Sequence, residues 1–201
     1  TLNMNLRVGV VEDDNLSRLT LVAALTSIGF EVTFHAASAS EALQLATIKS
    51  AQVYVLDLHL GPGPTGIDLA INLRRSNPSA GIVILTSFDD PRLLSAALPP
   101  LPGNTQYLVK RQVTDIEVLS RAIYDAASGK KSNFGKSSGG RLGKFSDIQI
   151  ETLRLVAAGL SNAEIARQRF VTERSVEVTI RRVAAALELK HDATQNQRVH
   201  I

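Results

Sequence analysis

The chain has 201 residues, of which 44% are hydrophobic and 20% charged, a composition typical of folded proteins with one or two domains. The absence of cysteine excludes disulfides, thiolate metal sites and cysteine nucleophiles, and no apolar run is long enough to span a membrane. Residues 1–128 hold 9 basic and 12 acidic residues, whereas residues 129–201 hold 13 and 7, an asymmetry that suggests a C-terminal half facing nucleic acid.

Strand and helix patterns alternate along the first 128 residues. Short apolar or β-branched runs predict five strands, at 6–11, 31–35, 52–56, 81–85 and 107–109. The first run leads directly into acidic residues, which predicts a strand rather than a signal peptide. Apolar residues at helical spacing predict five helices, which contain residues 16–23, 41–49 and 67–75, a short stretch after Pro91, and residues 116–127. This alternation predicts an α/β fold, a doubly wound five-stranded parallel sheet covered on both faces.

A linker and a small all-α domain are predicted to follow the first domain. Residues 129–144 are rich in glycine and serine, hold five basic residues and no acid, and indicate a flexible basic linker. Residues 145–201 hold 8 basic and 7 acidic residues, so charge alone gives weak support for nucleic-acid binding there. We therefore expect domains at 1–128 and 145–201.

The second domain has the pattern of a helix-turn-helix. A helix over 147–158 is followed by a capping box, Ser161 to Glu164, that opens a short second helix, and Thr172 caps a third. The third helix has an apolar face and an opposite face that carries Arg174, Val178, Arg181 and Arg182. Arginine suits both phosphates and guanine edges, so we expect this face to bind DNA. A small protein-binding bundle with a solvated arginine face gives the same pattern and stays an alternative.

Polar side chains stand where four of the predicted strands end. Because the carboxyl ends of parallel strands meet at one edge of the sheet, these side chains are expected to converge. They are Glu12, Asp13, Asp14, Asp57, Thr86 and Lys110. Clustered carboxylates favour a hard cation such as Mg²⁺, and a carboxylate beside this ion can attack phosphorus to form an acyl phosphate. The sequence thus predicts phosphoryl chemistry at this edge.

The segments VVEDDNLSR, VYVLDLHL, ILTSFDD and YLVKRQ resemble a response-regulator receiver domain. This resemblance, which covers residues from about 5 to 128, implies that Asp57 accepts a phosphoryl group from a sensor histidine kinase. It also implies that Glu12, Asp13, Asp57 and the backbone carbonyl of His59 bind Mg²⁺. By the same resemblance, Lys110 is the site's lysine, and Thr86 and Tyr107 form a switch pair that moves inward on phosphorylation.

Two stretches depart from the receiver pattern. The loop after Asp57 reads LHLGPGPTG, and Pro99, Pro100 and Pro102 must end the fourth helix early. That helix and the next strand normally form the output face. The departure motivates an alternative, an atypical regulator whose receiver is a protein-interaction module that works without phosphorylation. A phosphatase-type enzyme is disfavoured, because His59 stands where that class needs a second acid.

The segment FSDIQIETLRLVAAGLSNAEIARQRFVTERSVEVTIRRVAAALEL is similar to a LuxR-type, or NarL-type, DNA-binding domain. The resemblance implies that Glu177, Val178 and Arg181 occupy base-reading positions. The tail from His191 is mostly polar, although the family normally has an apolar last helix there that forms the dimer contact.

Together these features predict a two-component response regulator and transcription factor, not an enzyme, in which phosphorylation of Asp57 controls a helix-turn-helix. The expected DNA-binding residues are Arg174, Glu177, Val178, Arg181 and Arg182. The expected partners are a sensor histidine kinase, double-stranded DNA and a second copy of the chain as a homodimer, with Mg²⁺ as cofactor. We expect no membrane partner and a cytoplasmic location.

Overall fold

The computed structural model describes residues 5–95, 97–132 and 142–187. Among these, the residues up to Asp89 and those from Pro99 to 132 form one compact unit. The short stretch Asp90–Leu98 instead joins the residues from 142 onward in a second unit. None of the described helices is both long and apolar enough to cross a membrane.

The first unit is built on a five-stranded sheet with the order β2-β1-β3-β4-β5, and all neighbouring strands are parallel. The strands are β1 (Arg7–Val11), β2 (Glu31–Ala36), β3 (Val53–Leu56), β4 (Gly81–Thr86) and β5 (Thr105–Val109). The strand order reverses between β1 and β3, as in other doubly wound folds, where sites lie beyond the carboxyl ends of the strands. This confirms the predicted fold class.

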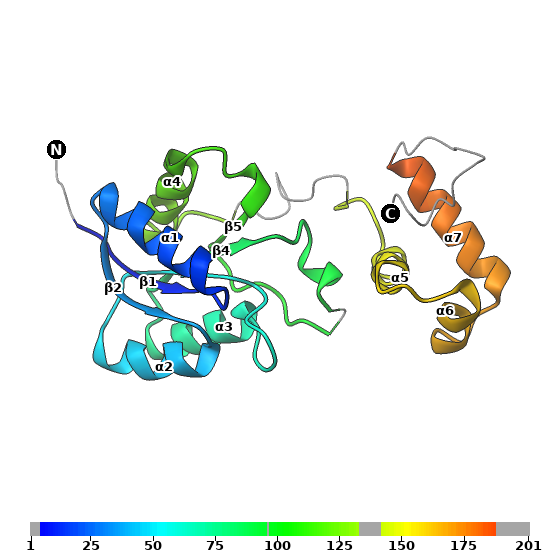
Figure 1. Ribbon diagram of the computed structural model, residues 1–201, viewed down its shortest axis with the longest axis horizontal. Coiled ribbons are helices and arrows are strands. Elements are labelled where there is room, and N and C mark those ends of the chain that lie inside the picture. The colour runs from blue at the N-terminus through cyan, green and yellow to red at the C-terminus, as the bar shows by residue number, and fades with distance from the viewer. Residues whose placement is uncertain (1–4, 96, 133–141, 188–201) are drawn as a thin grey trace. The chain divides into compact units, whose positions relative to one another are not determined.

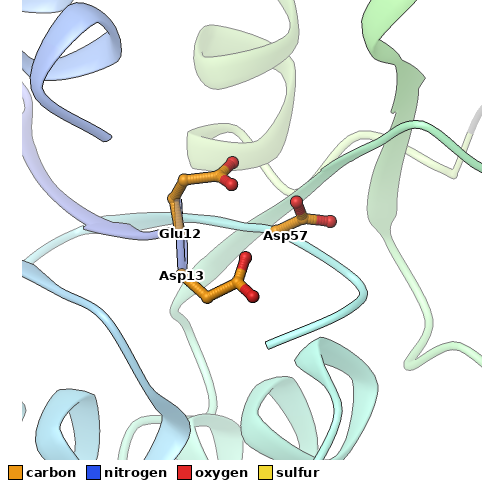
Figure 2. Close-up of side chains that lie close together, drawn as sticks. All are labelled: Glu12, Asp13 and Asp57. Carbon is orange, nitrogen blue, oxygen red and sulfur yellow. The ribbon is translucent and has the colours of Figure 1, made fainter. Parts of the chain in front are cut away.

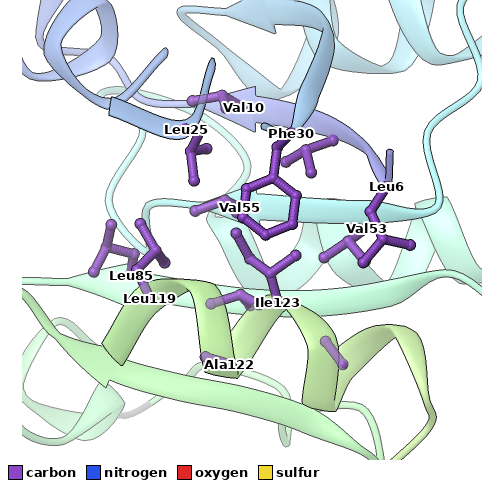
Figure 3. Packing of buried hydrophobic residues seen from close by; sticks show 13 residues of the cluster. Leu6, Val10, Leu25, Phe30, Val53, Val55, Leu85, Leu119, Ala122 and Ile123 are labelled. Carbon is purple, nitrogen blue, oxygen red and sulfur yellow. The ribbon is translucent and has the colours of Figure 1, made fainter. Parts of the chain in front are cut away.

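Four α-helices cover the sheet, two on each face. They are α1 (Asn15–Ser27), α2 (Ala39–Ile48), α3 (Gly66–Ser76) and α4 (Ile116–Ala127). Helices α1 and α4 lie on one face and α2 and α3 on the other (Figure 1). Leu25 of α1 and Ile123 of α4 pack onto Val10, Val53 and Val55 of the central strands (Figure 3). This apolar layer fixes the strands whose ends carry the site.

Helix α1 forms as predicted, but its buried face differs from the apolar spacing that predicted it. Leu16 and Leu19 are 75% and 48% exposed, whereas Leu25 is fully buried and Leu21 and Val22 pack against the core. The Leu16–Leu19–Ala23 spacing therefore marks the solvent side of the helix.

The short helix expected after Pro91 is present, but it is a 3₁₀ turn rather than an α-helix. Among the described residues between β4 and β5, the one helical element is the 3₁₀ turn η1 (Pro91–Leu93), which Asp90 caps by accepting from the backbone N–H of Arg92. Three prolines follow within a few residues, at 99, 100 and 102, and proline removes a helical N–H and clashes with the preceding turn. The short turn agrees with the early end of this helix that the prolines predict.

The described part of the second unit contains three helices, α5 (Asp147–Ala157), α6 (Asn162–Gln168) and α7 (Glu173–Ala186). The Ser161–Glu164 capping box opens α6 and Thr172 caps α7, both as predicted. Ile165, Val176 and Ile180 bury the faces that α6 and α7 share. The turn between these helices includes Phe170 at φ 53°.

Three polar contacts lie at the edges of this unit. Lys144 was assigned to the flexible linker, but its Nζ donates to the carbonyl of Ala186, at the C-terminal end of α7, over 2.6 Å. Such a cation is favoured at the carbonyl end of a helix. Arg92 donates to the carbonyl of Phe145 and to Asp147. These contacts explain why Asp90–Leu98 groups with the second unit.

Candidate functional site

Three carboxylates converge at the carboxyl edge of the sheet (Figure 2). Glu12 and Asp13 directly follow β1, and Asp57 directly follows β3, the neighbouring strand. One carboxylate oxygen from each lies within 4.8 Å of the others. The backbone N–H of Asp57 bonds to the carbonyl of Val11, which ties the two strand ends together. The predicted convergence is therefore present.

Lys110 pairs with two of these carboxylates. It directly follows β5, and its Nζ lies 2.7 Å from Glu12 Oε2 and 2.6 Å from Asp57 Oδ2. Glu12 and Asp57 are only 3% and 8% exposed, so the ammonium meets charges that water solvates poorly. Lys110 is thus positioned to neutralise charge on whatever group binds at Asp57.

Burial and the neighbouring charges both shift the pKa values of Glu12 and Lys110. Burial raises the pKa of Glu12, the hydrogen bond from Lys110 opposes this rise, and the nearby charge of Asp57 adds to it. For Lys110, burial lowers the pKa, but the bonds to Asp57 and Glu12 outweigh it and the net pKa is raised. One ammonium thus pairs with two of the three carboxylates.

This arrangement fits a divalent cation with oxygen ligands. One oxygen of each carboxylate lies within 4.8 Å of the others, close enough for a single cation to be shared by all three. The donor set is the hard, anionic one that this ion prefers. Glu12, Asp13 and Asp57 are the residues that would hold it. The backbone N–H of His59 donates to Asp57 Oδ1, at 3.3 Å, while a role for the His59 carbonyl stays a prediction.

The predicted switch pair lies beside the site and is already buried. Thr86 ends β4 and is fully buried, and its Oγ1 accepts from the backbone N–H of Phe88. The Tyr107 hydroxyl donates to the Phe88 carbonyl at 2.7 Å, and Tyr107 is 2% exposed. The expected inward movement of Thr86 and Tyr107 on phosphorylation stays a prediction.

Two arginines near the site were not singled out from the sequence. Arg18 of α1 donates to the carbonyls of Glu12 and Asp13, and Arg111 pairs with Asp89 at 2.6 Å. In the sequence, Arg18 follows the acidic pair by a short loop and one helical turn. This short separation is the only sequence signal for its hydrogen bonds to the Glu12 and Asp13 carbonyls. No such signal links Arg111 to Asp89, since the pairing depends on the turn between β4 and η1.

The predicted DNA-facing residues lie together on α7. Four of the five are exposed to solvent and Val178 is half-buried; the exposed ones are Arg174, Glu177, Arg181 and Arg182. The buried side of the same helix is formed by Val176, Ile180 and Val183. The amphipathic division predicted from the sequence is therefore confirmed.

Comparison with known families decides which class of protein carries this site. The family model of the response regulator receiver domain matches residues 8–123, more than half of the chain. The chain belongs to the response regulators. The model for bacterial regulatory proteins of the luxR family matches residues 144–195 of this response regulator. That second family consists of DNA-binding transcription regulators rather than enzymes.

Relatives of this response regulator match almost its whole length. The nitrate/nitrite response regulator NarP of Escherichia coli is 30% identical over 198 residues, which cover 92% of this chain and 89% of NarP. The DNA-binding transcriptional activator DevR/DosR of Mycobacterium tuberculosis is 27% identical over the same shares. A structure of two RcsB dimers bound to DNA shares the fold, with a TM-score of 0.60 and 23% identity over 98% of this chain and 97% of the other.

Proposed function

We propose that Asp57 accepts a phosphoryl group from a sensor histidine kinase and that this transfer controls binding of double-stranded DNA by α6 and α7. The observation that carries the proposal is the convergence of Glu12, Asp13 and Asp57 within 4.8 Å, with Lys110 bonded to two of them. Membership of the response regulators agrees with this use of the site.

The chemistry follows from the position of each group. A carboxylate oxygen of Asp57 attacks the phosphorus of a phosphohistidine, the P–N bond breaks, and the imidazole leaves and takes up a proton. The product is an acyl phosphate on Asp57. Lys110 stabilises the negative charge on the phosphoryl oxygens, and the hydroxyl of Thr86 donates to one of them.

Glu12, Asp13, Asp57 and the backbone carbonyl of His59 are the ligands that we assign to Mg²⁺. When bound, this ion supplies further positive charge opposite the transferred phosphoryl group. It also relieves the repulsion among the carboxylates, which Lys110 alone balances only in part. Removal of the ion by a chelator should therefore stop the transfer.

DNA binding is assigned to the exposed side of α7. Arg174, Arg181 and Arg182 supply positive charge for phosphates. Glu177, Val178 and Arg181 stand at the positions for base contacts. A helix presented in this way fits the major groove of B-DNA. The structure of RcsB dimers on DNA supports a homodimer as the binding form of this chain as well. We place the protein in the cytoplasm, where a kinase and DNA are both within reach.

The test compares DNA binding with and without a small phosphodonor. Duplexes are first selected from a random pool with phosphodonor-treated full chain and Mg²⁺, and the selected duplex is then titrated. We expect the phosphodonor to tighten binding by wild type and by Asp125→Asn, a control in the last turn of α4, but not by Asp57→Asn. Equal binding in all cases supports the alternative of a receiver that works without phosphorylation. Failure to select any duplex contradicts the DNA-binding assignment.

A further inference from the structure

Arg18 holds the acidic loop from the side of α1. Its Nη1 donates to the carbonyl of Glu12 at 2.8 Å and to that of Asp13 at 3.4 Å, and its Nη2 donates to Asn15 Oδ1 at 2.8 Å. All three partners are neutral oxygens, and two of them belong to the backbone of the acidic pair. The planar guanidinium therefore hydrogen-bonds to the backbone that carries the carboxylates rather than to the carboxylates themselves.

Other contacts complete this support for the loop between β1 and α1. Asp14 caps α1 by accepting from the backbone N–H of Ser17 at 2.7 Å, and the N–H of Glu12 bonds to the carbonyl of Ala36 in β2. These bonds fix the two ends of the loop. The Arg18 bonds fix its middle, where the side chains of Glu12 and Asp13 begin.

We propose that Arg18 is a positioning residue for the cation site: its grip on the Glu12 and Asp13 carbonyls sets the carboxylates in the geometry that Mg²⁺ requires. The inference rests on the proposed cation site and adds a residue that acts on it through the backbone. Groups that orient metal ligands in this way commonly change metal affinity by about 10- to 100-fold when removed.

The sign of the effect separates positioning from simple electrostatics. Arg18 is a cation next to a cation site, so removal of its charge alone should strengthen Mg²⁺ binding. Loss of the positioning contacts should weaken it. Mg²⁺ also demands near-ideal octahedral geometry, whereas Ca²⁺ accepts irregular ligand sets. A positioning role thus predicts a larger loss for Mg²⁺ than for Ca²⁺, and a role through charge predicts a gain for both.

The experiment measures Mg²⁺ and Ca²⁺ dissociation constants by calorimetry for the full chain and three variants. Arg18→Gln removes the grip and the charge, and Arg18→Lys keeps the charge without the planar fork. Arg7→Gln is the control, because Arg7 begins β1 and so stands at the opposite end of the strand that leads to Glu12. Urea unfolding without metal, followed by tyrosine fluorescence, monitors the stability of each variant.

We expect Arg18→Gln to bind Mg²⁺ at least about tenfold more weakly, with a smaller loss for Ca²⁺. Arg18→Lys should also bind Mg²⁺ more weakly than wild type, because it keeps the charge without the planar fork, and Arg7→Gln should match wild type. Unchanged or tighter Mg²⁺ binding by folded Arg18→Gln overturns the inference and leaves the proposed function standing. An equal loss for both ions also overturns it. If Arg18→Gln does not fold, wild-type affinity in Arg18→Lys overturns the inference. If wild type binds no Mg²⁺, the proposed cation site falls and this inference with it.

Discussion

Replacement of Asp13 by asparagine should make the chain more stable without Mg²⁺ and less responsive to it. The side chain keeps its size but loses a charge that lies within 4.8 Å of the carboxylates of Glu12 and Asp57. At this separation two like charges repel by about 1 kcal/mol in water and by about 3 kcal/mol at an effective dielectric constant of about 20. Because Asp13 is exposed, the repulsion energy of about 1 kcal/mol applies to each of its two pairs, with Glu12 and with Asp57. The charge of Lys110 offsets part of the sum, so we expect a gain of about 1 kcal/mol.

Magnesium should reverse the order of the two proteins. At 100 times its dissociation constant, an ion that binds only the folded state adds about 2.7 kcal/mol to the free energy of unfolding of wild type. Asp13→Asn has lost a ligand and should bind the ion more weakly. If the same ion concentration only equals the dissociation constant of the variant, the ion adds about 0.4 kcal/mol to the variant's free energy of unfolding. Wild type should therefore be the less stable protein without the ion and the more stable one with it.

The assay is urea unfolding followed by tyrosine fluorescence. All three tyrosines lie in the first 128 residues and the chain has no tryptophan, so the signal reports the unit that contains the site. High salt, which screens exposed charges, should shrink the difference measured without Mg²⁺. A variant less stable than wild type without the ion, or an equal response of both proteins to it, would refute the reasoning.

Three further predictions test other parts of the structure. Gly66→Ala should lower the free energy of unfolding by about 1–3 kcal/mol, because its Cβ would collide with the backbone carbonyl of Asp57; Gly103→Ala, which meets open space, is the control, and equal stability of the two variants contradicts the close approach. Burial raises the pKa of Tyr54 above its ordinary value of 10.0. The contribution of Tyr54 to the free energy of unfolding is therefore fully present below pH 10 and is lost as pH rises through the folded-state pKa. Urea titrations should thus show wild type losing stability in alkali relative to Tyr54→Phe but not to the exposed control Tyr124→Phe, and a parallel decline of all three proteins speaks against it. Arg181→Ala and Arg182→Ala should each lower the salt slope of DNA binding by about one and weaken binding to selected and random duplexes alike; unchanged affinity for both refutes the phosphate contacts.

The parts of the fold that the sequence predicts are those set by local patterns. Residues at the strand ends, such as Asp57 after a buried run, reach the site because a parallel sheet brings its carboxyl ends together. The caps at Ser161 and Thr172 are likewise local, since each side chain bonds to a backbone N–H three residues ahead. Such features depend on a few neighbouring residues and are therefore visible in the sequence.

The parts that the sequence did not predict depend on partners far along the chain. Leu16 and Leu19 have the spacing of a buried face, but the helix is rotated so that Leu25 meets the sheet. The sequence around Lys144 has the composition of a linker, whereas in the structure Lys144 donates to the carbonyl of Ala186 at the end of α7. The Tyr107 hydroxyl donates to the Phe88 carbonyl, nineteen residues away. No local pattern encodes contacts of this kind.

The central claim is that Asp57 is the phosphoryl acceptor and that the acidic pair beside it requires a divalent ion. The most direct measurement is the mass of the intact protein after incubation with Mg²⁺ and a small phosphodonor, for wild type and Asp57→Asn. The account predicts that wild type gains the mass of one phosphoryl group, that chelator prevents the gain, and that the variant gains none. A variant that is phosphorylated as readily as wild type, or a yield that chelator leaves unchanged, would contradict it.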